Sequence, residues 1–452
     1  MANQLFAALL VAYALVQSGC GSSLPAPTPP PRSASPAAPP PPPAAQMPAP
    51  SAGLSRLPTP NEAHLISELV GETERIRKLR FKEPVQVRIQ NRTAMRGYVS
   101  RAIEQEDLVR GRRRYVALGL LDPKLDVRDL LESLMEEELI GYYDPKERLL
   151  AVRDDVARAL GKVSSANDLE WRATVVHELV HALQDQHLGL GAAMDVERTT
   201  DGDNAFGALV EGDATLAMLG YVAGKAGVTL QEVVRDRLQL QNSLGASPDR
   251  ITGALKAAPA IVREPLLFRY RSGALFAASL FLRGEWEAVN QAHANVPGAT
   301  LSVIEPRYFQ PAQSPAREPR VELPDLSWLE AHGYRQVDQD VLGSLEFGVA
   351  LGLPEPAVAA LTRAWRGDRY AVLEPLQGDG LGGDASVWCL RFGSAKDARG
   401  AHSRLGQLRD TYGLDRRALQ VGATLIVARG LPAAATEELF ARFAKERAAD
   451  VP

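Results

Sequence analysis

The sequence predicts a mixed α+β protein, in which a mainly helical domain with a small sheet is followed by a small C-terminal α+β module. Three observations support this class. The middle of the chain has long segments with the apolar spacing of helices and a few short strand-like runs. A proline-rich break covers residues 306–324. Beyond it, strand-like runs and helical segments occur together.

The composition is that of a folded chain long enough for two or three domains. Of the 452 residues, 45% are hydrophobic and 23% are charged. The formal net charge of −4 gives no reason to expect a nucleic-acid partner. Cys20 and Cys389 are the only cysteines, so no disulfide framework is expected. Cys389 lies in a strand-like apolar run and is expected to be a buried, unreactive thiol.

The N-terminus has the features of a processed leader. Residues 5–16 form an apolar run with the length of a signal-peptide core, too short to span a bilayer. Ser18, Gly19 and Cys20 follow, and this resembles a bacterial lipoprotein processing site. We therefore expect removal of residues 1–19 and lipidation of Cys20, which would anchor the protein in the cell envelope at the outer membrane. Simple secretion is the alternative.

The segment after Cys20 is unlike a folded domain. Residues 24–60 are dominated by Pro, Ala and Ser, which cannot build a core and favour an extended chain. At about 3.1 Å per residue, such a segment reaches on the order of 100 Å. We expect residues 20–60 to be a disordered tether, although a plain disordered tail would have the same composition.

The expected elements of the folded domain, residues 61–310, follow from periodicity and turn residues. A helix is expected at 61–79 after Pro60, and a strand at 85–90. Two apolar runs on either side of residues 144–147 predict a β-hairpin. The remaining helices are expected at 92–106, 108–119, 126–138, 167–188, 204–224, 229–244 and 272–294.

The C-terminal module is assigned to residues 321–452. Strands are expected at 369–375, 386–392 and 423–429, and helices at 396–410 and 433–447. The glycine-rich residues 378–383 are expected to form a hairpin loop. Because the module has no His and Glu at the spacing of metal ligands, we expect it to dock or present a substrate.

The most informative motif is HExxH at residues 177–181. On a helix, His177 and His181 are about 40° apart on one face and can share one metal ion. Glu178 can reach a water on that ion without binding the ion. Zinc suits this arrangement because it uses three protein ligands and lowers the pKa of water toward ~7, so that Glu178 can accept a proton. The alternative is a helix whose histidines only satisfy hydrogen bonds in the core.

Two positions compete for the third ligand. His187 falls on the last position of the metzincin pattern HExxHxxGxxH, but Gln184, a good helix former, replaces its glycine. If the helix continues, His187 is about 15 Å along the axis from His177 and points about 80° away. Glu211 lies thirty residues after His181 on a second helical pattern, where a carboxylate is costly to bury unless paired or bound to metal. We expect Glu211 to be the ligand, which is the gluzincin arrangement.

Five further residues are candidates for supporting roles. Asp213, and with less support Asp185, could accept a hydrogen bond from a ligand histidine. Tyr270, Tyr142 or Tyr143 could donate a hydrogen bond to the oxyanion of a tetrahedral intermediate. The alternative is solvation at the surface for the acids and packing for the tyrosines.

A resemblance rests on longer segments than the HExxH motif. These are HELVHALQDQHL (177–188), ALVEGDA (208–214), GYYDPKERLLAV (141–152), FRYRSGALF (268–276) and GEWEAVNQAH (284–293). Together they resemble a family of uncharacterised bacterial and archaeal metallopeptidases that are secreted or lipid-anchored. The resemblance covers roughly residues 65–310. It implies a zincin-like fold, one zinc ion held by His177, His181 and Glu211, and Glu178 as the base.

The expected function is therefore a membrane-tethered zinc metallopeptidase that hydrolyses peptide or protein substrates. One alternative is a zincin-fold protein that binds metal and serves as an envelope assembly or interaction factor without proteolytic activity. Another is an amidohydrolase that acts on cell-wall material. Glu178 favours an enzyme, since a protein without catalytic activity would be free to lose it.

Overall fold

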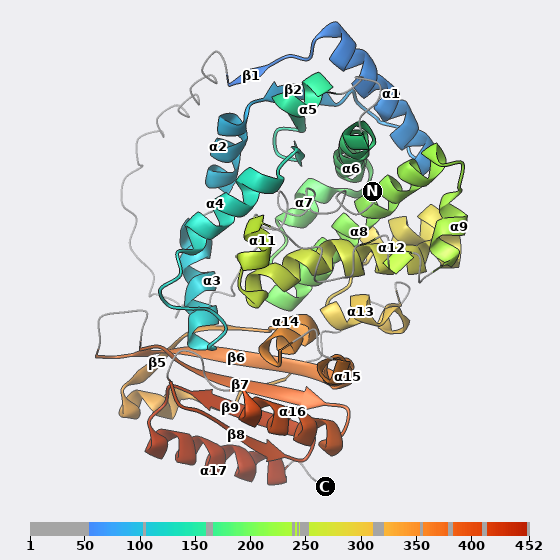
Figure 1. Cartoon of the computed structure of the whole chain (residues 1–452). Coiled ribbons are helices and arrows are strands. Elements are labelled where there is room, and N and C mark those ends of the chain that lie inside the picture. The colour runs from blue at the N-terminus through green and yellow to red at the C-terminus, as the bar shows by residue number, and fades with distance from the viewer. Residues whose placement is uncertain are drawn as a thin grey trace, which may run out of the picture.

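The computed structural model describes residues 54–102, 105–159, 166–236, 240–241, 244, 253–310, 321–352, 356–377, 383–408 and 414–449. These residues form a mixed α+β structure, as the sequence predicts. Figure 1 shows a largely helical body next to a second layer, formed by a five-stranded sheet with its own helices. The expected signal peptide, Cys20 and most of the expected tether lie outside the described residues.

The small sheet of the helical body contains four strands in the order β1 (Ser55–Arg56), β2 (Gln86–Gln90), β4 (Leu149–Arg153) and β3 (Gly141–Asp144). β2 and β4 are parallel, while the other two pairs are antiparallel. β3 and β4 form the predicted hairpin, and Asp144 accepts hydrogen bonds from two backbone N–H groups in its turn. β3 is at the edge of the sheet and contacts the helix that carries HExxH.

The ordered chain begins earlier than the expected end of the tether at residue 60. Ser55 and Arg56 pair with β2, and Thr59 caps the first helix, α1 (Pro60–Arg77). The Arg56 guanidinium group donates hydrogen bonds to Glu62 and to Asp154. Asp154 is 98 residues away in the chain, so the local composition could not reveal this contact.

Helices make up most of this body. In chain order they are α1, α2 (Arg92–Ala102), α3 (Gln105–Ala117), α4 (Val127–Glu138), α5 (Asp154–Ala159), α6 (Ala166–Leu188), α7 (Leu190–Met194), α8 (Thr200–Lys225), α9 (Leu230–Arg235), α11 (Gly253–Ala257), α12 (Ala260–Ala294), α13 (Thr300–Ile304) and the 3₁₀ turn η2 (Pro306–Tyr308). α12 begins twelve residues before the predicted helix 272–294, and α9 covers only part of the predicted helix 229–244. Across the described ranges, no helix has both the length and the hydropathy to cross a membrane.

Helix α8 is the centre of the body. It is buried along nearly its whole length, and both α6 and α12 pack against it. A Cβ atom at Gly212 would lie 2.2 Å from the backbone carbonyl of Gly273, and one at Gly273 would lie 2.2 Å from Ala208 O. Only glycine permits so close an approach of two backbones. This crossing fixes α8, and the Glu211 side chain that it carries, against α12.

The second sheet is antiparallel throughout, in the order β5 (Tyr334–Asp340), β6 (Trp365–Pro375), β7 (Ala385–Phe392), β9 (Thr424–Arg429) and β8 (Arg416–Val421). Alternate residues pack on opposite faces. One face packs against α14 (Gly343–Ala350), α15 (Pro356–Ala364) and α16 (Ala395–Gln407), and the other against α17 (Ala433–Ala449) and the 3₁₀ helix η3 (Ser327–His332). Cys389 is buried in the second face, and burial raises the pKa of its thiol to about 12.

Candidate metal centre

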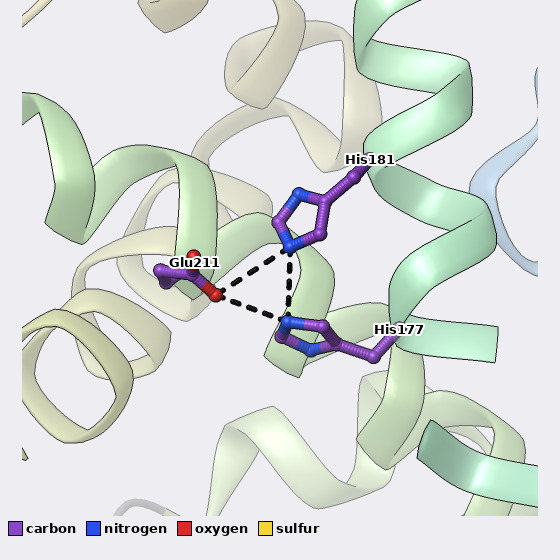
Figure 2. Close-up of side chains that lie close together, drawn as sticks. All are labelled: His177, His181 and Glu211. Atoms are coloured by element: carbon purple, nitrogen blue, oxygen red, sulfur yellow. Dashed lines mark hydrogen bonds and ion pairs between the residues drawn. The ribbon is translucent and has the colours of Figure 1, made fainter. Parts of the chain in front are cut away.

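The two histidines of the HExxH motif lie side by side on α6. Apolar residues around the motif bury this part of the helix, and His177 and His181 are only 1% and 4% exposed. One helical turn separates the two residues, so both rings extend to the same side. Their Nε2 atoms are 3.1 Å apart. Figure 2 shows both rings directed toward a common point.

Glu211 reaches this point from α8. Its Oε2 atom is 3.0 Å from His177 Nε2 and 3.5 Å from His181 Nε2 (Figure 2). Two ligand atoms about 2.1 Å from a tetrahedral metal ion are separated by about 3.4 Å. The three edges of the His–His–Glu triangle are close to this separation. The buried cluster of His177, His181 and Glu211 could therefore hold a metal ion.

The electrostatics of the cluster favour a positive charge at its centre. Burial opposes the charged form of His181, but Glu211 outweighs burial and raises the pKa of that imidazole to about 9. Burial also opposes ionisation of Glu211, yet His181 and the hydrogen bond with His177 lower the pKa of its carboxyl group to about 2. His177 Nδ1 and Glu211 Oε1 are buried without a hydrogen-bond partner at normal geometry among the described residues.

Gln184 holds the outer side of the His181 ring. Its Oε1 atom is 2.8 Å from His181 Nδ1, and its Nε2 donates hydrogen bonds to Val210 O and Asp213 Oδ2. Asp213, one of the two candidate acceptors behind a ligand histidine, is linked to His181 through the Gln184 amide. From the sequence, Gln184 was recognised only as a helix former. Its spacing of three residues from His181, which places both on one helix face, was the signal for this contact.

Asp213 is fully buried and binds several donors. Arg77 donates to both of its oxygens, at 2.7 and 3.0 Å, and His293 Nε2 lies 3.0 Å from Oδ2. Although burial opposes ionisation, Arg77 and His293 hold the pKa of Asp213 well below its ordinary value. Asp185 instead accepts hydrogen bonds from the Tyr143 hydroxyl group and from Gly191 N–H.

His187 lies apart from the cluster. α6 continues through Leu188, as the helix-forming character of Gln184 predicts, and Gly189 follows it in a left-handed conformation with φ of 69°. His187 Nε2 is 2.6 Å from the carbonyl oxygen of Arg80. The three residues that converge in the described chain are His177, His181 and Glu211.

Glu178 is next to the cluster and also contacts the edge strand. Its Oε2 accepts a hydrogen bond of 2.9 Å from the Tyr143 N–H group of β3. Burial raises the pKa of Glu178 to about 7, with Glu211 acting in the same direction and His181 and the Tyr143 N–H group opposing. A carboxyl group with a pKa near 7 is suited to accept and return a proton at neutral pH.

The three candidate tyrosines occupy different places. Tyr270 on α12 stacks on His177 with ring centroids 6.0 Å apart. Burial, Glu211 and Glu178 raise the pKa of Tyr270 well above its ordinary value. Tyr142 stacks on Tyr98 at 3.8 Å and donates to Gln90, while the Tyr143 hydroxyl group points to Asp185. Tyr270 therefore lies against a histidine of the cluster, whereas the hydroxyl groups of Tyr142 and Tyr143 bond to Gln90 and Asp185.

Comparison of the chain with protein-family models, with curated proteins and with solved structures finds no match. The geometry of the cluster formed by His177, His181 and Glu211 is therefore the main evidence on function.

Proposed function

We propose that the protein is a zinc metallopeptidase of the gluzincin type with a zincin-like catalytic domain. The observation that carries this proposal is the convergence of two imidazole nitrogens and one carboxylate oxygen beside Glu178. Two histidines and a glutamate are a ligand set of catalytic zinc sites, which keep a further position open for water or substrate. The resemblance of the sequence to secreted and lipid-anchored metallopeptidases supports the same assignment.

Each nearby side chain has a role in this proposal. Zinc, when bound, supplies a Lewis acid that lowers the pKa of water and polarises the peptide carbonyl group. Glu178 accepts a proton from the attacking water and passes it to the leaving amine. The Tyr143 N–H group orients Glu178 through one carboxylate oxygen. The high pKa of Tyr270 keeps its hydroxyl group protonated, so it can donate a hydrogen bond to a developing oxyanion.

The test is digestion of a broad peptide library by the full chain, as purified, after removal of metal with a chelator, and after return of zinc. We expect cleavage that is lost on chelation and restored by zinc. If the zinc-loaded protein leaves every peptide intact, the metal-binding assembly factor becomes the better assignment. Cleavage of cell-wall amides but not of peptides would support the amidohydrolase.

We also propose that the protein is anchored through a diacylated Cys20 at the end of a proline-rich tether. The apolar run at residues 5–16 and the Ser18-Gly19-Cys20 sequence support this localisation. Mass spectrometry of the mature N-terminus should find lipid on Cys20. A mature chain without lipid would instead indicate a secreted protein.

A further inference from the structure

A buried cluster of polar side chains lies behind His181, on the side away from the proposed metal position. It joins residues from four helices: Gln184 on α6, Asp213 on α8, Arg77 on α1, and Asn290 and His293 on α12. Gln184, Asp213 and Arg77 are each at most 1% exposed. Such a group is costly to bury unless it is well paired, and these residues are joined by several hydrogen bonds.

The hydrogen bonds determine the orientation of the Gln184 amide. One end faces two acceptors, Val210 O at 3.0 Å and Asp213 Oδ2 at 2.9 Å, so this end must be the NH₂ group. The other end, Oε1, therefore faces His181 Nδ1 at 2.8 Å. An amide oxygen only accepts hydrogen bonds, so Nδ1 must carry the proton. In the neutral ring, the lone pair of Nε2 is then directed at Glu211 and His177.

Asp213 is itself held in place. Arg77 binds both of its oxygens and also donates a hydrogen bond of 2.7 Å to Asn290. The Arg77 guanidinium group stacks 4.5 Å from the ring centre of Trp286. His293 adds a contact of 3.0 Å to Asp213. A bidentate arginine fixes the position of a carboxylate more strictly than a single hydrogen bond does.

A break in α12 accompanies this arrangement. The helix is interrupted at Gly284 and Glu285, and Glu285 has φ of 52°, a region that residues other than glycine rarely adopt. Trp286, Asn290 and His293 all follow the break. These are the residues of the segment GEWEAVNQAH that contact Arg77 and Asp213. Unusual backbone conformations persist where the surrounding structure determines them, often at functional sites.

We propose that Gln184 is a positioning residue that holds His181 as the Nδ1–H tautomer, with Nε2 free to bind metal, and that Asp213, Arg77 and His293 hold Gln184. The proposal deepens the proposed function and rests on the metal centre. A neutral amide in this place leaves His181 a neutral imidazole ligand. Partners that orient a ligand in this way typically contribute about 10–100-fold to metal affinity.

The first test reads the tautomer in the metal-free protein and needs no activity. Nitrogen-15 spectra of the histidine rings distinguish the protonated from the unprotonated nitrogen, and the chain has seven histidines. Assignment uses loss of the signal in His181→Gln. At a pH where the ring is neutral, wild type should show His181 as a single Nδ1–H form. In Gln184→Met, which keeps the length but not the polar atoms, the Nε2–H form should appear. A wild-type Nε2–H form would overturn the proposal.

The second test measures zinc affinity by competition with a chromophoric chelator. Gln184→Met removes the acceptor at His181 Nδ1 and should weaken zinc binding about 10–100-fold. Gln186→Met is the matched control, because the Gln186 amide on α6 also accepts a backbone hydrogen bond from Lys82 and donates one to Glu83, but contacts no ligand. Its affinity should equal that of wild type. Gln184→Leu serves in place of Gln184→Met if the latter does not fold.

These results separate two failures. Unchanged zinc affinity in both Gln184 variants would overturn the positioning role even if the protein cleaves peptides. Weakened zinc affinity in a protein that cleaves nothing would uphold the positioning role while removing the peptidase proposal. Equal losses in the Gln184 variants and in Gln186→Met would show a general effect of altering α6 and would also overturn the proposal.

Discussion

Glu211 and Asp368 are both fully buried carboxylates, but their surroundings differ. Each oxygen of Asp368 accepts two hydrogen bonds. The donors are the backbone N–H groups of Leu342 and Gly343 and the indole N–H groups of Trp365 and Trp388. Glu211 instead faces two imidazole nitrogens through one oxygen, while its other oxygen has no hydrogen-bond partner at normal geometry in the described chain.

This difference distinguishes a structural carboxylate from a candidate ligand. Donors saturate Asp368, which thereby fixes the start of α14 on the second sheet. At Glu211, three groups that can each offer a lone pair lie 3.0 to 3.5 Å from one another, so one metal ion could bind all three. Burial alone is common to both sites. The direction of the surrounding donors and acceptors is what separates them.

The largest expected effect is at Glu178, which is beside the candidate metal centre but is not one of its three proposed ligands. Glu178→Gln keeps the shape and removes the proposed base, so the proposed peptide hydrolysis should slow by about 10²–10⁴-fold. Initial rates on a peptide that wild type cleaves, measured with zinc in excess, give this ratio. Zinc content should match wild type. Equal rates in the two proteins would remove Glu178 from the mechanism.

A third buried carboxylate, Glu346, extends the comparison, because its protonation should make the free energy of unfolding depend on pH. Its Oε1 accepts hydrogen bonds from Tyr115 and Asn204, whereas its Oε2 is buried without a partner among the described residues. Burial raises its pKa from 4.5 to about 8. Between these values the native state holds a proton that the unfolded state has lost, so the free energy of unfolding falls as the pH rises.

This contribution amounts to about 1.4 kcal/mol per pH unit. Glu346→Gln cannot titrate, so it should lack this part of the slope between pH 5 and pH 8. Urea unfolding of both proteins across this range measures the difference. Parallel curves for wild type and variant would show that Glu346 is ionised in the native state at neutral pH.

Asp368→Asn tests the structural carboxylate. The variant directs an amide NH₂ group at two N–H donors, and leaving buried donors unpaired costs about 1–3 kcal/mol. The free energy of unfolding should fall by this amount, as measured by urea denaturation. Zinc affinity should stay at the wild-type value. A loss of zinc from a folded Asp368→Asn protein would mean that the two sites are coupled, contrary to their separate hydrogen bonds.

The smallest effect is expected at His187, the histidine that the metzincin pattern would place on the metal. Its Nε2 atom lies 2.6 Å from the Arg80 carbonyl oxygen, at an exposed position. His187→Ala should change the free energy of unfolding by about 0.5 kcal/mol or less. Zinc content, measured by atomic absorption, should stay unchanged. Release of zinc by this variant would favour the metzincin ligand set.

The sequence was sufficient for the parts of the site that depend on local spacing. Histidines four residues apart on a helix must share a face, and the same helical periodicity placed His187 away from them. Glu211 followed from the cost of burying a carboxylate without a partner. The structure brings His177 and His181 on α6 together with Glu211 on α8.

The remaining parts depend on contacts that local patterns do not encode. Arg77 binds Asp213 across 136 residues of chain, and nothing in either segment indicates the pairing. The break at Gly284 and Glu285 that precedes His293 also has no clear signal in an otherwise helical sequence. Strands β5 and β8 were missed because they border the sheet and are largely polar and partly exposed, so neither has the nearly continuous apolar run of β7 or β9.

The central claim is that Glu211, with His177 and His181, holds one zinc ion per chain. Zinc stoichiometry and affinity in wild type, Glu211→Gln and Glu346→Gln test it most directly, because both variants make the same change at a buried glutamate. We expect wild type and Glu346→Gln to bind one zinc each with equal affinity. Glu211→Gln should lose more than the 10–100-fold that outer partners contribute. Full retention of zinc by Glu211→Gln would contradict the proposed metal centre.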